Sequence, residues 1–314
     1  MALRCNNMSA EYIPGVEAGT EDGRISSNTL HSHKIDIDCD TGHSQEGVQR
    51  IEILDFGNEG FLLYKLLTES ECTYIINEGE KIGFGAIRGA QDNYRSAQRI
   101  SIDSQSLADL LWTRIQGYLE ELEISSDPHS HHIHGIPCVV EGKWVPVGLN
   151  KLFRLCRYHP GGHFAPHFDG FFEEDSKHRS MKTLMVYLNG DFTGGSTNFV
   201  DESQTLHMDE TGKYCAEEEN ILCKIQPEAG MAIIFNHHRL HEGQKLGDNK
   251  KYILRTDIMY KKVSEDNIGH TDEKALALIK EAEELEAMGE CEKAAMVLRK
   301  AFKLSPAIED SYWA

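Results

Sequence analysis

The sequence predicts a mainly β fold with flanking helices, built on an antiparallel sandwich or barrel. Three observations predict it. From Trp144 to Tyr260 the chain consists of short segments that are rich in β-branched and aromatic residues and end at Gly, Asn, Asp or Pro. No helical spacing of apolar residues separates these segments, which favours antiparallel pairing over crossover helices. Amphipathic helical segments lie only before and after this region.

The N-terminal part divides in two. Residues 1–50 are rich in Ser, Gly, Asp, Asn and His and show no periodicity, so we expect a mostly disordered tail. Residues 51–143 are expected to form a helical support. Within it, Thr68 or Ser70 can cap a helix. Residues 104–122 form the clearest amphipathic helix, which should pack on the outside of the sheet.

Four segments between residues 144 and 262 are the expected strands of the barrel: 151–158, 180–190, 230–237 and 251–260. An acidic insertion at 201–224 connects two strands that a tight turn could join. Long loops inside compact domains are usually functional lids or disordered, and both alternatives stay open for this insertion.

Residues 272–306 form an expected C-terminal α-hairpin. Gly289, Ala294, Ala301 and Pro306 are spaced as in the second helix of a tetratricopeptide repeat, which makes the hairpin similar to one such repeat. A single unit cannot bury its own apolar face. We therefore expect it to dock on the barrel or to make a protein contact.

Composition restricts the partners and the compartment. The net charge is −19, from 51 acids against 32 bases, which disfavours binding to nucleic acid. The eight cysteines form no CxxC pair, so reduced thiols are expected. No run of about 18 apolar residues predicts a membrane span, and no apolar signal-peptide core is visible. These features predict a cytoplasmic or nuclear protein that does not bind membranes.

The stretch YHPGGHFAPHFD, Tyr158 to Asp169, carries the clearest chemical signal. His167 and Asp169 are two residues apart, so on a strand both point to the same face. A histidine and a carboxylate are two of the three ligands in the 2-His-1-carboxylate triad of non-haem Fe(II) oxygenases. The third ligand must come from another strand. His241 follows the segment 230–237, and its neighbours His237 and His238 compete for this role.

Two cations lie on the last predicted strand. Lys251 and Arg255 stand ten and fourteen residues after His241 and share one face of the strand. A cation at either place would pair with a dicarboxylate lying beside the metal.

These motifs together resemble the 2-oxoglutarate/Fe(II)-dependent dioxygenases of the prolyl 4-hydroxylase type over residues 51–262. The resemblance rests on these segments: Tyr158-x-x-Gly161-Gly162-x4-His167-x-Asp169, Thr183 to Asn189, Gly194-Gly195-Ser196-Thr197-x-Phe199, Pro227-x-x-Gly230, His241-Glu242-Gly243 and Lys251-Tyr252.

The resemblance implies a double-stranded β-helix, a jelly-roll or cupin-like barrel. It implies Fe(II) held by His167, Asp169 and His241, with 2-oxoglutarate and O2 as co-substrates and ascorbate as reductant. The distal carboxylate of 2-oxoglutarate would meet a cation on the last strand. Lys251 occupies the family position, and Arg255 is the alternative. The remaining expected contacts of the 2-oxoglutarate pocket are Tyr187, Tyr158 and Thr183.

The expected activity is hydroxylation of an unactivated C–H on a protein side chain, with a prolyl residue as the first candidate. Two alternatives stay open: hydroxylation of a small molecule or free amino acid, and a catalytically idle barrel that acts as a binding module. The sequence does not name the substrate or the oligomeric state.

Overall fold

The computed structural model describes residues 16–17, 33–34, 47–87, 90–125, 137–264 and 270–313. They divide into two compact units, one within residues 12–121 and 145–261 and the other within residues 122–144 and 262–314. The tail expected at 1–50 lies outside the described residues except for 16–17, 33–34 and 47–50.

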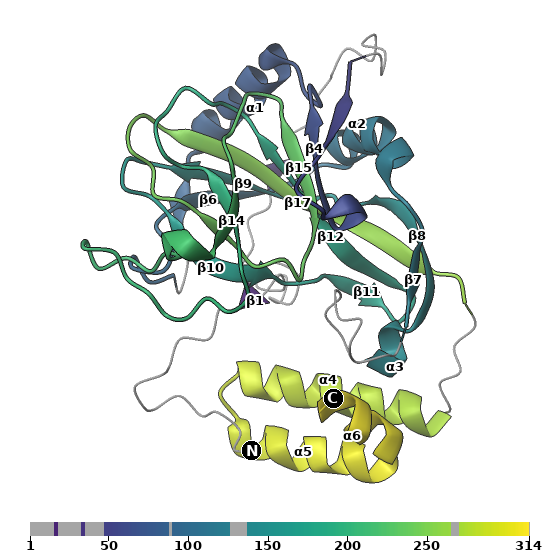
Figure 1. Cartoon of the computed structure of the whole chain (residues 1–314). Helices are drawn as coiled ribbons and strands as arrows, with labels where there is room; N and C mark the ends of the chain where they lie inside the picture. Colours follow the sequence, from purple (N-terminus) through teal and green to yellow (C-terminus); the bar gives the residue numbers. More distant parts are fainter. Residues whose placement is uncertain are drawn as a thin grey trace. The chain divides into compact units, whose positions relative to one another are not determined.

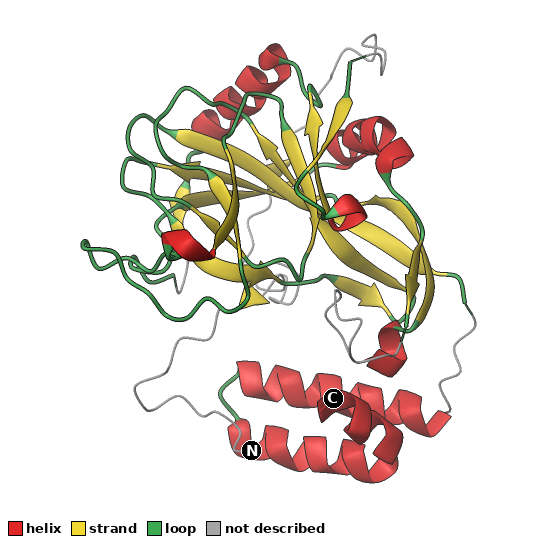
Figure 2. Cartoon of the chain, in the orientation of Figure 1, coloured by secondary structure: helices red, strands yellow, loops and turns green. Residues whose placement is uncertain are grey.

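The larger unit contains a small sheet and a large sheet (Figures 1 and 2). The small sheet has the strand order β1-β10-β16-β13-β14. Its strands are β1 (Val16–Glu17), β10 (Phe164–Asp169), β16 (His241–Gly243), β13 (Thr197–Val200) and β14 (Ile221–Ile225). Only the pairing of β1 with β10 is parallel among these strands; the other three pairings are antiparallel.

The large sheet follows the order β2-β6-β9-β17-β12-β15-β4-β3. These strands are β2 (His33–Lys34), β6 (Gln98–Asp103), β9 (Leu152–Tyr158), β17 (Lys251–Lys262), β12 (His178–Tyr187), β15 (Ala232–Asn236), β4 (Gly60–Tyr64) and β3 (Gln49–Glu52). Three further strands attach to it or to its neighbours: β5 (Gly85–Ala86), β11 (Glu173–Asp175) and β8 (Gly142–Leu149).

The chain alternates between the two sheets. It passes from β9 to β10, from β12 to β13, from β14 to β15 and from β16 to β17, each time changing sheet. The resulting orders, β9-β17-β12-β15 and β10-β16-β13-β14, are those of a double-stranded β-helix. The four predicted strands of the barrel are β9, β12, β15 and β17.

Two helices accompany the large sheet. Helix α1 (Glu69–Ile82) begins at Thr68, whose side chain accepts from the Glu71 amide while the Glu71 carboxylate accepts from the Thr68 amide. This confirms Thr68 as the cap. The helix packs closely on β9, since a Cβ on Gly79 would lie 2.5 Å from Leu155 Cδ2.

Helix α2 (Gln105–Ile115) is capped by Ser104 and buries Leu107, Leu111 and Ile115. It is shorter than the 104–122 predicted from periodicity. A 3-10 turn, η2 (Gln116–Tyr118), follows it directly. Other 3-10 turns are η1 (Gly57–Glu59) and η3 (Glu218–Asn220).

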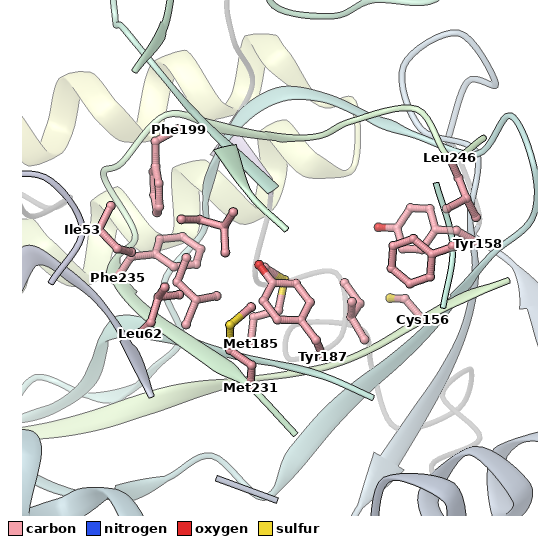
Figure 3. Close-up of a cluster of buried hydrophobic side chains, with 14 of the residues drawn as sticks. Ile53, Leu62, Cys156, Tyr158, Met185, Tyr187, Phe199, Met231, Phe235 and Leu246 are labelled. Carbon is pink, nitrogen blue, oxygen red and sulfur yellow. The ribbon is translucent and has the colours of Figure 1, made fainter. Parts of the chain in front are cut away.

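The main core lies between the two sheets (Figure 3). The large sheet contributes Met185, Tyr187 and Phe235, and the small sheet contributes Phe199 and Ile225. In Figure 3, Tyr158, Cys156 and Leu246 gather at one end of this cluster and Phe199 and Phe235 at the other. Large apolar side chains packed from both sides hold the sheets together.

The smaller unit contains β7 (Leu122–Ile124), which pairs with the start of β8, and the short helix α3 (Pro137–Val140). Its main body is helical: α4 (His270–Ala287), α5 (Cys291–Leu304) and α6 (Pro306–Trp313). Ala275 and Ala301 are fully buried where α4 and α5 pack together with Phe302 and Ile308. The C-terminal helical hairpin is therefore present, with α6 in addition.

Candidate active site

Strands β10 and β16 bring three metal-ligand side chains together. His167 and Asp169 lie on the same face of β10, and His241 on β16 stands directly opposite His167 in antiparallel register. All three are buried, with exposed fractions of 3%, 1% and 5%. Two segments that are far apart in the sequence therefore meet at one point of the small sheet.

The carboxylate lies between the two imidazoles. His167 Nε2 is 3.8 Å from Asp169 Oδ1, and His241 Nε2 is 3.9 Å from Asp169 Oδ2. One ligand atom from each residue lies within 4.8 Å of the others. Adjacent ligands at about 90° on one ion are about 3.0 Å apart when each bond is about 2.1 Å. The three donors are thus grouped within about 1 to 2 Å of the spacing that a single metal ion requires.

Hydrogen bonds fix the tautomer of both histidines. His167 Nδ1 lies 2.8 Å from the backbone oxygen of Ala165, and His241 Nδ1 lies 2.8 Å from that of Arg239. A carbonyl oxygen only accepts, so Nδ1 carries the proton in each neutral ring. Each Nε2 therefore presents its lone pair beside Asp169. Metal-binding histidines are oriented in this way.

Thr183 and Arg255 each contact one oxygen of Asp169. Thr183 Oγ1 donates to Oδ2 at 2.6 Å, and Arg255 Nη2 lies 3.0 Å from Oδ1. Thr183 was expected beside Tyr187 as a 2-oxoglutarate contact. The structure shows its hydroxyl donating to the Asp169 carboxylate, and its expected contact with 2-oxoglutarate stays a prediction.

The competing histidines are placed elsewhere. The His237 ring lies between Ser180 and Thr183, and His238 stacks on Phe168 with ring centroids 5.0 Å apart. Among the described residues, His167, Asp169 and His241 form the one group of three side chains that can hold a metal ion.

Lys251 lies in an aromatic environment. It is 4% exposed, and Nζ donates to the backbone oxygen of Gly195 at 2.6 Å. The ammonium lies 5.6 and 5.7 Å from the ring centres of Tyr158 and Tyr187, within cation–π range. Burial lowers the pKa of Lys251 to about 7. An incoming anion would therefore stabilise the ammonium form of Lys251.

The two tyrosines are held by their strands. Tyr158 pairs directly with Lys251 between β9 and β17. Tyr187 is completely buried, and its hydroxyl donates to Thr197 Oγ1 at 2.8 Å. Burial raises the pKa of Tyr187, so the phenol stays protonated.

Arg255 has a different environment from Lys251. Besides Asp169, its Nη2 lies 3.6 Å from Asp257 Oδ1, and Arg154 Nη1 lies 3.4 Å from the other oxygen of Asp257. The guanidinium thus lies between two carboxylates, and one of them is the metal-ligand candidate Asp169.

One pocket connects these groups. Six of the expected site residues line it: Tyr158, His167, Asp169, His241, Lys251 and Arg255. Thr183 and Tyr187 are not among the described residues that form its wall. The remaining lining residues are Arg95, Arg154, Cys156, Phe164, Met185, Thr197, Phe235, Glu242, Gly243 and Ile253.

Comparison with known protein families finds a match over the segment that contains these site residues. Residues 153–256 match the 2OG-Fe(II) oxygenase superfamily. This segment belongs to that superfamily. The chain is accordingly an oxidoreductase, and the family implies Fe(II), 2-oxoglutarate and O2 as its cofactor and co-substrates.

Solved structures with a similar fold include several prolyl hydroxylases. The viral collagen prolyl hydroxylase of Paramecium Bursaria Chlorella virus-1 is 20% identical, with 65% of this chain and 97% of that one covered and a TM-score of 0.39. A Pseudomonas putida prolyl-4-hydroxylase is 15% identical, with coverage of 66% and 94% and a TM-score of 0.40. A Trichoplax adhaerens prolyl hydroxylase, solved with a peptide of hypoxia inducible factor, is 15% identical, with coverage of 64% and 83% and a TM-score of 0.42. No curated protein matches the chain.

The pocket also contains two polar residues, Arg154 and Glu242, to which the sequence motifs assigned no role. Arg154 lies on β9 and shares its face with Cys156 and Tyr158, so strand alternation from Tyr158 was a usable signal. Glu242 is 3% exposed and accepts from Asn198 Nδ2 and the Ala216 amide. Burial raises its pKa. Nothing in the local sequence predicts these partners of Glu242.

The insertion at 201–224 is ordered and tied to the oxygenase domain. Its hairpin, bridged at Met208 and Tyr214, is bonded through Lys213 Nζ to the backbone oxygen of Gly161 and to Ser96 Oγ. The Tyr214 amide donates to the backbone oxygen of Asn93 at 2.8 Å. Residues 221–224 already belong to β14. The insertion thus holds the loop that presents Arg95 to the pocket.

In the part of the chain that the structure describes, every helix is too short or too polar to cross a lipid bilayer.

Proposed function

We propose that this chain is an Fe(II)- and 2-oxoglutarate-dependent hydroxylase that acts on an unactivated C–H of a protein side chain, with a prolyl residue as the first candidate. One observation carries the proposal. Three buried metal-ligand side chains and a buried lysine with aromatic walls line the same pocket.

His167, Asp169 and His241 are the proposed Fe(II) ligands. Two imidazole lone pairs and one carboxylate on adjacent strands form the facial donor set that suits Fe(II) and leaves positions open. With 2-oxoglutarate and O2, bound iron supplies the oxidising power that converts an unactivated C–H to an alcohol, with release of succinate and CO2. The chain supplies the geometry that confines this chemistry to one place.

The proposed anchor for the distal carboxylate of 2-oxoglutarate is Lys251. The described neighbours of the Lys251 ammonium are a carbonyl oxygen and two aromatic rings, and none of them is an anion. The distal carboxylate would therefore supply the anionic partner. Arg255 is already 3.0 Å from Asp169 and 3.6 Å from Asp257. We therefore assign Arg255 to the support of Asp169, and Lys251 to 2-oxoglutarate, with Tyr158 as part of the wall.

The site residues orient the ligands and exclude water. Thr183 and Arg255 hold the two oxygens of Asp169, and the backbone carbonyls of Ala165 and Arg239 hold the histidine rings. Burial of all three ligands keeps bulk water from the metal side of the pocket. Ascorbate is the proposed reductant for cycles in which no substrate is hydroxylated.

The cellular setting follows from the thiols. The described cysteines 72, 156, 215, 223 and 291 are all free, which supports a reducing compartment, the cytosol or nucleus. Helix α5 exposes Met296 and Leu304, and Met288 is exposed directly after α4, which supports the hairpin as a protein contact.

The direct test is turnover of 2-oxoglutarate to succinate by purified protein with Fe(II) and ascorbate. His167→Ala, Asp169→Ala and His241→Ala should each abolish it, and His238→Ala is the matched control. Normal turnover in the three ligand variants would refute the metal site. Incubation with a proteome and a search for products heavier by one oxygen atom, on prolyl or other side chains, tests the substrate class.

A further inference from the structure

We infer that His237 is a positioning residue for the metal-binding carboxylate. It acts through a relay of hydrogen bonds, Ser180–His237–Thr183–Asp169, that lies behind the ligand and outside the pocket wall. The inference rests on the proposed function, because it takes Asp169 to be a metal ligand.

Three short contacts form the relay. Ser180 Oγ lies 2.9 Å from His237 Nε2, His237 Nδ1 lies 3.0 Å from Thr183 Oγ1, and Thr183 Oγ1 lies 2.6 Å from Asp169 Oδ2. The four side chains have exposed fractions between 0% and 3%. Bulk water therefore does not replace any of these bonds.

The Asp169 carboxylate at the end of the relay fixes which group donates in each hydrogen bond. A carboxylate only accepts, so the single hydroxyl proton of Thr183 goes to Asp169. Thr183 Oγ1 must then accept from His237, which places the imidazole proton on Nδ1. In the neutral ring Nε2 accepts, and the Ser180 hydroxyl donates to it. Ser180 Oγ accepts in turn from the Phe172 amide at 2.8 Å. Every donor meets an acceptor, so the network stabilises one orientation of Asp169.

His237 holds Asp169 at a second point. The Asp169 amide donates to the His237 backbone oxygen at 3.1 Å. His237 thus fixes the backbone of the ligand directly and its carboxylate through Thr183. Hydrogen bonds in such a chain strengthen one another in a buried environment. With Arg255 on the other oxygen, the plane of the carboxylate is set before a metal ion arrives.

The test is the affinity of the metal-free full chain for Co(II), a spectroscopic substitute for Fe(II), measured by dialysis and by the visible absorption of the bound ion. Loss of an outer partner of a metal ligand typically costs about 10- to 100-fold in affinity. His237→Phe keeps a ring but no donor, and should lose this much. His237→Asn places an amide donor near the position of Nδ1, and should recover most of the affinity.

Further variants separate positioning from general damage. His237→Gln places its amide near Nε2, toward Ser180, and should behave like His237→Phe although it is polar. Thr183→Val should weaken binding and Thr183→Ser should not. The double variant His237→Phe/Thr183→Val should bind no more weakly than Thr183→Val alone, because both interrupt one route. His238→Ala is the matched control and should bind Co(II) like the wild type.

Wild-type affinity in folded His237→Phe or His237→Gln overturns the inference, as does equal loss in His237→Asn and His237→Gln. The inference is also overturned if the loss of Co(II) affinity in the double variant equals the product of the losses in the two single variants. These outcomes are distinct from failure of the proposed function, in which the wild type binds no Co(II) or His167→Ala binds it equally well.

Discussion

The affinity for 2-oxoglutarate should fall steeply as the pH rises above 7. Burial lowers the pKa of Lys251 to about 7, so in the free protein the ammonium gives way to the neutral amine near neutral pH. Only the ammonium pairs with a carboxylate. The bound carboxylate raises the pKa of Lys251 again, so binding takes up a proton above pH 7. Full affinity is thus present below pH 7 and is lost above it.

The magnitude follows from the protonated fraction. With a pKa of about 7, this fraction is about 0.76 at pH 6.5 and about 0.03 at pH 8.5, and the apparent dissociation constant is the intrinsic one divided by the fraction. The dissociation constant for 2-oxoglutarate should therefore rise about 25-fold over this range.

Calorimetric titration of the Mn(II)-loaded protein with 2-oxoglutarate measures this effect. Lys251→Arg supplies the matched variant, because arginine stays charged at every pH in the range. Its affinity should be nearly independent of pH. A flat profile in the wild type, or the same slope in Lys251→Arg, would refute both the titration of Lys251 and its role as anchor. Intact affinity for 2-oxoglutarate in Lys251→Ala, with loss of that affinity in Arg255→Ala, would move the anchor to Arg255.

Two further predictions concern stability and the insertion. Gly230 has a φ of +79°, and a Cβ there would lie 2.0 Å from the backbone oxygen of Leu67. Gly230→Ala should therefore lower the free energy of unfolding by at least about 2 kcal/mol in a denaturant titration. Gly148 has open space around it, so Gly148→Ala is the control and should not lower the free energy of unfolding in this way. A Gly230→Ala protein of normal stability would contradict the reasoning. Lys213→Met removes the bonds of the insertion to Gly161 and Ser96, and should speed cleavage by a glutamate-specific protease at the exposed Glu210 without changing 2-oxoglutarate turnover. An unchanged cleavage rate would show that other contacts hold the insertion.

The sequence predicted the barrel, and it predicted which site residues share one face of a strand. Side chains alternate between the two faces of every strand, so this second prediction needs only local sequence. His167 and Asp169 share a face, as do Lys251 and Arg255, and all four line the pocket. The cap of helix α1 was predicted, but the end of helix α2 was not. The amphipathic pattern after Ser104 continues past Ile115, but the chain tightens there into a 3-10 turn.

The partners of the polar side chains were not predictable, since they depend on the register between strands that are distant in the sequence. Thr183 lies on β12, which pairs with β15, and its hydroxyl meets Asp169, which lies on β10 of the other sheet. Arg255 on β17 of the large sheet likewise meets Asp169 on β10 of the small sheet, because the two sheets pack face to face. Alternation gives the direction of a side chain, whereas tertiary pairing decides what it meets.

The pairing of His167 with His241 has a consequence for the newly made chain. The two residues are 74 positions apart (241 − 167), and one register between β10 and β16 brings them together. At a synthesis rate of roughly 5 to 20 residues per second, the second histidine leaves the ribosome roughly 4 to 15 seconds after the first. Until then β10 holds an incomplete donor set, and a slip of one residue on β16 would turn His241 to the opposite face. At the proposed iron site, loading is thus expected late in biogenesis, and retention of the metal would report that β10 and β16 have joined in the correct register.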